Sequence, residues 1–481
     1  MTNQALPVAI IGAGPVGLAA AAHLLERGET PIIFEAGAEI GANIRQWEHV
    51  RMFSPWEYTA DRATVALLES HGWEMPPKDT SPTGRDLIEK YMQPFAQLPE
   101  VRQHIHLNSR VTAISRRYID KMKDTNRESA PFVIRVQCDD GSEEIIEARA
   151  VIDASGTWHS PNPLGSDGLP AMGESSHQAH IYYGIPDVQG KYQQRYANKR
   201  VMVVGGGHSA INALLDLVNL QDSYPKTCVT WVLRTTNMQR IYGGGSDDAL
   251  PARGQLGIRI RTLVEAGRVS IAAPFRIRKI STDETGVTVT GETPQGFETL
   301  QVDEIVAATG ARPDLIMLRE LRLALDSSLE TTPLLAPMID PNIHSCGTVR
   351  PHGEAELRHP EKDFYIVGMK SYGRAPTFLL ATGYEQVRSI VAALVGDWEA
   401  ARDVQLNLPE TGVCVTDWLS DEISSVAASA CCGTPSENVA TPVAVQEVVS
   451  LNAISLSSTK PQPVDSQTSS RDCGCDDTCC T

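Results

Sequence analysis

Positive charge is scarce in this sequence. Its 481 residues include 42 Lys and Arg against 59 Asp and Glu, which gives a formal net charge of −17. Nucleic acids and anionic membrane surfaces attract basic proteins, so neither is expected as the main partner. Arg clusters remain in the body of the chain, and a small polyanion such as a dinucleotide is therefore a compatible ligand.

Long hydrophobic runs are lacking as well. The most apolar segment, residues 8–25, is interrupted by Gly12, Gly14 and Gly17 and follows no basic residue, which is unlike an export signal. No other segment reaches membrane-spanning length without charge. We therefore expect a cytoplasmic protein without a membrane partner, and its length predicts two or three domains.

Cysteine is scarce outside the C-terminal tail. Cys138, Cys228 and Cys346 stand alone in the body, which has no closely spaced dithiol pair. Cys138 and Cys228 fall on predicted strands, where an isolated cysteine is expected to pack as a small buried hydrophobe. A disulfide framework would spread its cysteines through the fold, so this distribution agrees with a cytoplasmic location.

One structural plan occurs twice in the body. A buried strand, a glycine turn and a helix are predicted at residues 8–25 and again at 200–218. Each copy continues with another strand and a paired-strand segment, closing on IDASG (152–156) or AATG (307–310). Strand–helix–strand units form parallel sheets covered by helices. The predicted fold class is α/β, with two Rossmann-like, doubly wound domains and β-meander crossovers.

The first glycine turn has the spacing of a dinucleotide-binding motif. Gly12 permits the tight turn, Gly14 lets a pyrophosphate approach the backbone, and Gly17 lets the helix pack on its strand. The helix N-terminus offers unpaired N–H groups and a favourable dipole to phosphate. Glu35 ends the next strand, where a carboxylate accepts hydrogen bonds from a ribose diol. The alternative is a plain glycine turn of an α/β domain.

The second glycine turn is a GxGxxA variant of the same motif. Its next strand ends on Arg234 instead of an acid, and Arg240 lies close in sequence. A guanidinium suits the 2′-phosphate of NADPH, whereas an exposed Arg with no ligand is the alternative. His208 has two interpretations: it contacts the ligand, or it is a solvent-exposed residue of the turn. The predicted contacts are Gly205, Gly207, His208, Ser209, Ala210, Arg234 and Arg240.

Two dinucleotide sites require two cofactors that exchange electrons. Two nicotinamide cofactors would not serve as redox partners for each other, whereas NADPH can pass a hydride to a flavin. The acid-bearing site therefore suits FAD, and the arginine-bearing site suits NADPH. We predict an FAD domain made of residues 1–157 and 310–405, an NADPH domain at 158–309, and a flexible acidic tail at 406–481.

Over roughly residues 5–400 the sequence resembles the two-dinucleotide-binding-domain flavoproteins, and among them the flavin-containing monooxygenases. IDASG and VAATGARPD (306–314) match the two crossover motifs of these proteins. MGESSH (172–177) followed by Tyr182 is similar to the monooxygenase signature, although its Phe is missing and the aromatic residue comes one position late. The resemblance implies that Trp47, Gly310 and Gly368 contact FAD.

Residues 49–56, HVRMFSPW, depart from the usual monooxygenases, whose Asn near the flavin is missing here. This segment resembles a smaller group of flavoproteins associated with arsenic-resistance operons. For Trp47, Arg51, Phe53 and Trp56, the alternative to a role at the flavin is a packed aromatic cluster.

The tail from residue 406 is rich in Ser, Thr, Pro and acidic residues and has little periodicity, which predicts disorder. Thiolates prefer thiophilic ions, and trivalent arsenic or antimony readily takes three sulfur ligands. Metalloid capture, a redox relay to the flavin, and an incidental tail are the three interpretations. The tail cysteines concerned are Cys431, Cys432, Cys473, Cys475, Cys479 and Cys480.

These expectations combine into one preferred function. NADPH reduces FAD, the reduced flavin reacts with O₂, and a soft nucleophile accepts oxygen. The favoured nucleophile is a trivalent arsenical or antimonite, which becomes pentavalent. The alternatives are oxygenation of an organic sulfide or amine, a disulfide or metal-ion reductase that uses tail cysteines, and a metalloid-binding protein with an incidental flavin. The sequence identifies no catalytic residue and no oligomeric state.

Overall fold

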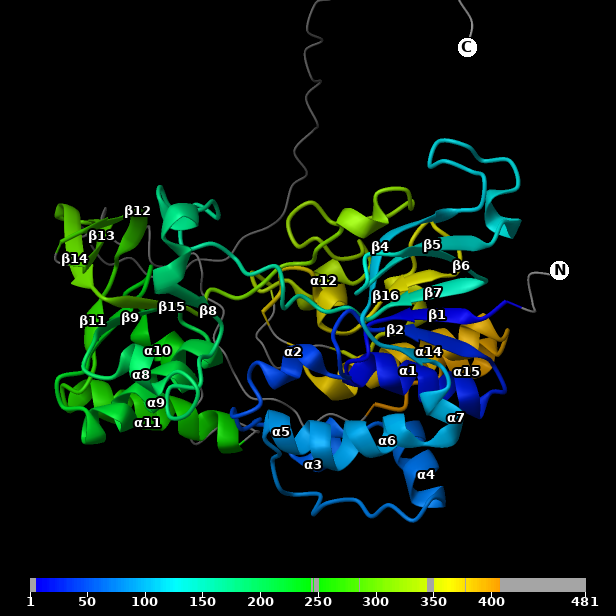
Figure 1. The fold of residues 1–481 in the computed structure, drawn as a ribbon, viewed down its shortest axis with the longest axis horizontal. Helices are drawn as coiled ribbons and strands as arrows, with labels where there is room; N and C mark the ends of the chain where they lie inside the picture. The colour runs from blue at the N-terminus through cyan, green and yellow to red at the C-terminus, as the bar shows by residue number, and fades with distance from the viewer. Residues whose placement is uncertain are drawn as a thin grey trace, which may run out of the picture. The chain divides into compact units, whose positions relative to one another are not determined.

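Two parallel β-sheets, each accompanied by an antiparallel three-stranded sheet, organise the chain (Figure 1). The computed structural model describes residues 6–243, 245, 251–284, 286–343, 350–376 and 378–406. All of them belong to one unit, Met1–Asp421. The predicted α/β fold class is confirmed, with parallel sheets covered by helices.

The first parallel sheet has the strand order β16-β7-β1-β2-β3. Strand β1 pairs with β2 on one side and with β7 on the other, so the chain order reverses between β1 and β7. Most residues of these strands are buried, as expected for a parallel sheet that is covered on both faces. The strands are β1 (Val8–Ile11), β2 (Pro31–Phe34), β3 (Ile105–His106), β7 (Ala150–Asp153) and β16 (Phe364–Ile366).

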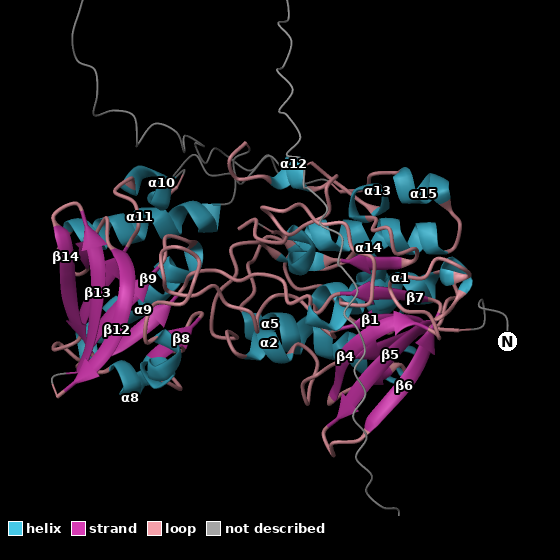
Figure 2. Cartoon of the chain, turned by 90° about the horizontal axis from the view of Figure 1, so that it is seen from above, coloured by secondary structure: helices cyan, strands magenta, loops and turns pink. Residues whose placement is uncertain are grey.

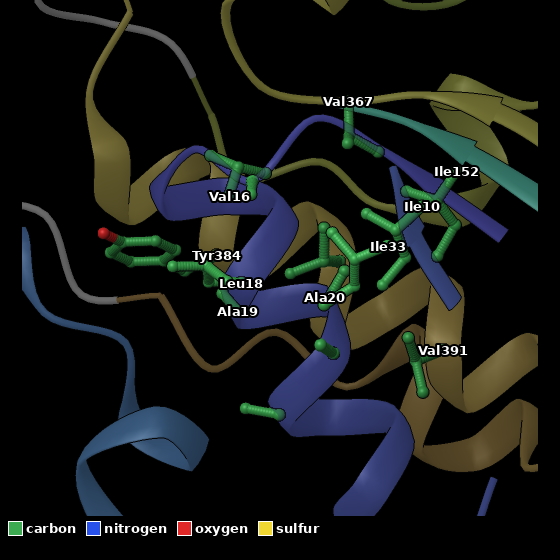
Figure 3. Packing of buried hydrophobic residues seen from close by; sticks show 14 of the residues in the cluster. Ile10, Val16, Leu18, Ala19, Ala20, Ile33, Ile152, Val367, Tyr384 and Val391 are labelled. Atoms are coloured by element: carbon green, nitrogen blue, oxygen red, sulfur yellow. The ribbon is translucent and has the colours of Figure 1, made fainter. Parts of the chain in front are cut away.

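Helices α1 (Pro15–Glu26) and α14 (Leu380–Leu394) pack together against one face of this sheet. Figure 3 shows Ala20 of α1 close to Ile10 and Ile33 of the strands. The run of buried alanines at 19–22 lets α1 approach both the sheet and α14 closely. The other α-helices of this region are α2 (Ala42–Arg45), α3 (Trp56–Thr59), α4 (Arg62–Ser70), α5 (Gly84–Leu87), α6 (Gln93–Gln97), α7 (Pro99–Arg102), α12 (Ala336–Ile339), α13 (Glu354–Leu357) and α15 (Trp398–Arg402).

The opposite face of the sheet is covered by an antiparallel meander, β4-β5-β6, visible as neighbouring strands in Figure 2. Apolar residues of β1 and β7 share a core with Ile114, Phe132 and Ile134 of the meander. This is the paired-strand segment that the sequence predicts before IDASG. Its strands are β4 (Ser109–Arg116), β5 (Phe132–Cys138) and β6 (Glu143–Ala148).

The second parallel sheet repeats the plan with the order β11-β10-β9-β15-β8 and a meander β12-β13-β14. Helix α9 (His208–Ser223) shares a buried core with Trp231 of the sheet and Ile260 of helix α11 (Pro251–Glu265). The strands are β8 (Ile181–Tyr183), β9 (Arg200–Val204), β10 (Cys228–Val232), β11 (Ser270–Ala272), β12 (Arg276–Asp283), β13 (Gly286–Thr293), β14 (Gly296–Val302) and β15 (Glu304–Ala307), and the short helices are α8 (Gln193–Tyr196) and α10 (Met238–Tyr242).

The isolated cysteines are less buried than the sequence predicts. Cys138 is half-buried and Cys228 is exposed, because each is the terminal residue of its strand, where the covering layers end. Cys346 and all tail cysteines lie outside the described residues. None of the helices in the described part of the chain combines the length and the apolar character that a membrane crossing requires.

Candidate functional site

The reversal of strand order between β1 and β7 defines the first candidate site. In such sheets a dinucleotide binds outside the carboxyl ends of the strands at the reversal. Gly12 follows β1 there with φ +101°, and a Cβ atom at this position would lie 2.9 Å from Ala154 O. A Cβ at Gly17 would lie only 2.0 Å from Gly12 O. The fold itself therefore requires both glycines.

Gly14 stands apart from these two glycines. A Cβ at Gly14 would meet no atom within 4 Å, and its φ of −77° is accessible to any residue. It is the N-terminal cap residue of α1 and provides no side-chain cap. The N–H groups and the dipole at the start of α1 therefore face open space. We call this space, beside the glycine loop at residues 12–17, the first cradle; it fits a pyrophosphate.

Glu35, directly after β2, is held beside the same loop. Its Oε2 accepts a hydrogen bond from the Ala13 N–H at 2.8 Å, and its Oε1 accepts one from the Gly37 N–H at 2.9 Å. A carboxylate has about four acceptor positions, so capacity remains for a ribose diol. The position agrees with the predicted role of Glu35 in binding the ribose of a dinucleotide.

The two other glycines predicted at the FAD site lie in different surroundings. Gly368 follows β16 with φ +68°; its N–H donates to Gln386 Oε1 at 2.8 Å, and Val16 of α1 lies beside it. Gly368 is therefore part of the cradle's wall. Gly310, with φ +81°, accepts a hydrogen bond from the Asn162 N–H at 2.9 Å. Gly310 lies in the second crossover motif (306–314), whose residues 309–312 run beside residues 160–162.

In segment 47–56, Trp56 belongs to the buried core around α1 and Trp47 packs against that core, whereas Phe53 contacts His208. Trp47 is half-buried, and its ring carbons lie 3.0 Å from where a Cβ at Gly84 would be. Trp56 is buried and lies edge-on to Tyr91, with ring centroids 6.4 Å apart. Trp56 is therefore a packed core residue, as the alternative interpretation expects. For Trp47 a contact with FAD stays a prediction.

Phe53 has a different neighbour. Its ring centroid lies 5.4 Å from that of His208, the first residue of α9. His208 itself is exposed. The segment that resembles the arsenic-associated flavoproteins thus contacts the second candidate site, which sequence reasoning did not predict.

The second candidate site repeats the geometry of the first. Gly205 has φ +127°, and a Cβ there would lie 2.2 Å from Ala308 O. A Cβ at Gly207 would meet nothing within 4 Å. Ser209 is exposed at the start of α9, whereas Ala210 is fully buried. Ala210 therefore allows α9 to pack on its strand. Gly207 faces open space at the start of α9, which we call the second cradle.

Arg234 lies just beyond the carboxyl end of β10, which neighbours β9 in the sheet. Its side chain is exposed, and its Nη1 donates to Ser166 O at 3.4 Å, a long hydrogen bond. The guanidinium is thus accessible on the edge where the glycine loop lies. Arg240 belongs to α10, and its side chain lies outside the described residues.

Sequence reasoning missed two buried carboxylates. Glu174, inside the MGESSH segment, accepts hydrogen bonds from the N–H groups of Leu164 and Ala171 and from the Tyr183 hydroxyl. It anchors this segment structurally. Asp153, the acid of IDASG, forms a buried ion pair with Lys370. An acid at the end of an otherwise apolar strand is the signal that could have drawn attention to it.

Neither a dithiol nor a metal site occurs in the described part of the chain. Its two cysteines, Cys138 and Cys228, belong to different sheets. The same residues contain no group of three or more His, Cys, Asp or Glu side chains that could hold a metal ion.

Comparisons with known proteins agree with this architecture. The chain matches the family described as pyridine nucleotide-disulphide oxidoreductase over residues 9–342. It is 26% identical over 226 residues to senecionine N-oxygenase of Tyria jacobaeae, which covers 45% of this chain and 46% of that protein. It is 22% identical over 348 residues to ferredoxin–NADP reductase of Lactobacillus johnsonii, covering 71% and 85%. The chain thus spans about half the length of the N-oxygenase.

Among solved structures, the bacillithiol disulfide reductase of Bacillus cereus has a similar fold. The TM-score is 0.57 at 19% sequence identity, and the match covers 81% of this chain and 99% of that structure.

Proposed function

Because the chain belongs to the pyridine nucleotide-disulphide oxidoreductase family, we propose that it is an NADPH-dependent FAD monooxygenase that oxidises a soft nucleophile. The favoured substrate is a trivalent arsenical or antimonite, which is converted to the pentavalent form in the cytoplasm. The FAD domain comprises residues 1–157 and 310–405, and the NADPH domain comprises 158–309.

The two open glycine cradles carry this proposal. Gly14 and Gly207 leave space for a pyrophosphate at the start of α1 and α9. Glu35 beside the first cradle suits the ribose of FAD, and the accessible Arg234 beside the second suits the 2′-phosphate of NADPH. Bound FAD would supply the redox chemistry that carries electrons from NADPH to O₂. The chain's own residues bind and orient the two cofactors.

We favour a monooxygenase over a disulfide reductase because the described residues contain no pair of neighbouring cysteines. A flavin-dependent disulfide reductase that works through a dithiol needs two neighbouring thiols near the flavin, and the two described cysteines lie on separate sheets. The similar proteins carry both kinds of name, an N-oxygenase and a disulfide reductase. A reductase that uses tail cysteines is the second candidate, because six of the tail's seven cysteines fall in two close groups, Cys431–Cys432 and Cys473, Cys475, Cys479 and Cys480.

The substrate assignment rests on the sequence. The resemblance of segment 49–56 and the tail cysteines both favour a thiophilic metalloid. An organic sulfide or amine is the alternative soft nucleophile.

Parallel measurement of NADPH consumption and O₂ uptake tests these assignments. The purified protein is assayed alone, with methylarsenite, with antimonite, and with methyl phenyl sulfide and trimethylamine. We expect methylarsenite to stimulate both signals equally and to yield a pentavalent product. If only the sulfide or the amine stimulates NADPH consumption and O₂ uptake, the substrate is an organic sulfide or amine and not a metalloid. NADPH consumption without O₂ uptake in the presence of a disulfide would favour the reductase.

A further inference from the structure

A buried ion pair occupies the carboxyl edge of the first sheet. Lys370 Nζ lies 2.7 Å from Asp153 Oδ2 and 3.1 Å from Ser155 Oγ. The Lys370 and Asp153 side chains are 1% and 0% exposed. Asp153 Oδ1 accepts hydrogen bonds from the Ser155 hydroxyl at 2.6 Å and from the Ser155 N–H at 3.1 Å. One carboxylate and one ammonium are thus fixed in place away from water.

This pair lies directly beside the first glycine loop. Asp153 is paired in register with Ile11, the residue before Gly12. The backbone that follows Asp153 packs on the loop, because Ala154 O and Ser155 Cα lie 2.9 and 3.1 Å from where a Cβ at Gly12 would be. The two charges are therefore next to the cradle that takes the pyrophosphate.

The strand order indicates which half of the dinucleotide lies above the pair. If Glu35 binds the adenosine ribose, the adenosine half of FAD would lie on the β2 side of the loop. The half that carries the flavin would then lie on the opposite side, where β7 and β16 end. Asp153 ends β7, and Lys370 follows β16.

Stability alone does not account for the pair. Desolvation of two charges commonly outweighs their attraction, so apolar residues would hold this position equally well. The ammonium has three N–H groups, for which the described residues supply two acceptors. Lys370 also lines a small cavity with His359, whose buried Nε2 has no hydrogen-bond partner among the described residues. Buried charges and unsatisfied polar atoms are concentrated at functional sites.

We propose that Lys370 is a positioning residue that cancels the charge of Asp153 beside the bound flavin, so that the balance of these two buried charges, and not either charge alone, keeps the flavin's reduction potential at its working value. This inference rests on the proposed FAD site. A hydride from NADPH reduces the neutral flavin and adds one negative charge to it. A nearby cation stabilises that charge, and a nearby anion destabilises it.

Single-charge variants test the inference through equilibrium redox titration of the flavin-loaded protein. D153N leaves the cation and should raise the potential, whereas K370M leaves the anion and should lower it. Each shift should change the ratio of reduced to oxidised flavin at least tenfold at a fixed solution potential, which is about 30 mV for a two-electron couple. K370R and the double variant D153N/K370M should remain near the parent value.

A matched control is E361Q. Glu361 forms buried ion pairs with Arg116 at 2.8 Å and with Arg127 at 2.6 Å, and it precedes β16, at the end of the strand away from Lys370. Its loss should change stability and leave the potential unmoved. If the single-charge variants do not fold, S155A serves instead: it removes one donor to Asp153 and one acceptor of Lys370, so it should shift the potential, whereas E361Q should not.

Shifts of one sign in D153N and K370M, or no shift in flavin-loaded variants, would overturn this inference and leave the proposed function standing. A parent protein that binds no FAD would overturn both.

Discussion

The carboxylate of Glu35 accepts a hydrogen bond from the backbone N–H of Ala13 at 2.8 Å, which joins the acid at the end of β2 to the centre of the glycine loop. The residue proposed to bind the ribose and the loop proposed to bind the pyrophosphate are therefore one rigid unit. A second bond, from Gly37 N–H, fixes the other carboxylate oxygen. This preorganisation lowers the cost of ordering the site when a dinucleotide binds.

Gly14 and Gly17 should respond differently to substitution. G14V places its side chain in open space with no backbone strain, so the fold should survive while the pyrophosphate is displaced. G17A brings a methyl group within 2.0 Å of Gly12 O and should destabilise the domain itself. Flavin absorbance and thermal unfolding, measured on both variants, separate the two effects. FAD retained by G14V at the parental level would contradict the cofactor assignment.

The second cradle should discriminate between nicotinamide cofactors. The parent protein should prefer NADPH to NADH, and R234A should weaken NADPH binding by about 1.5–3 kcal/mol, or roughly 10- to 150-fold, with NADH little affected. G207V should abolish reduction by either cofactor while FAD stays bound. Binding constants from fluorescence titration provide the measurement. Equal use of NADPH and NADH by the parent would rule out this role for Arg234.

The pair His23–Asp61 should make stability depend on pH. Burial lowers the pKa of His23, but the charge and hydrogen bond of Asp61 at 3.0 Å outweigh it and raise the pKa to about 9. Because the folded pKa lies above the unfolded value of 6.5, this stabilisation is complete below pH 6.5 and is lost as pH rises toward 9. The loss should amount to about 3 kcal/mol.

Chemical denaturation of the parent and of H23Q at several pH values between 6.5 and 9 measures this loss. The difference between the two proteins should shrink as pH rises. His359, whose pKa burial lowers to about 4, affects stability only below pH 6.5 and does not interfere. A constant difference across the range would show that His23 is not charged in the folded protein.

Truncation after Asn407 should separate the interpretations of the tail. If the tail collects metalloid, the truncated protein should keep FAD and oxidise the arsenical at high concentration, with losses confined to low concentration, because a tethered trap raises only the local supply of substrate. If the tail relays electrons, turnover should disappear at every concentration. Serine at Cys473, Cys475, Cys479 and Cys480 tests the terminal cluster in a chain of full length.

Local patterns in the sequence predicted the fold well. Strand–turn–helix units depend on neighbouring residues, so both glycine motifs and the α/β class could be recognised directly. The same motifs did not reveal which glycine faces a ligand. Only the geometry separates Gly14, above open space, from Gly17, which lies against backbone.

Pairings across long sequence distances could not be predicted. Lys370 and Asp153 are 217 positions apart, and they meet because β16 and β7 are neighbours in the sheet. The contact between Phe53 and His208 likewise depends on how two separate segments fold. The exposure of Cys228 was mispredicted because the pattern placed it on a strand without indicating that the strand begins there.

Anaerobic addition of NADPH to the purified protein shows whether it is an NADPH-dependent flavoprotein. We expect a visible flavin spectrum, with one FAD for each chain, that bleaches on addition of one equivalent of NADPH and returns when O₂ is admitted. A protein without flavin absorbance, or a bound flavin that NADPH leaves oxidised, would contradict this expectation.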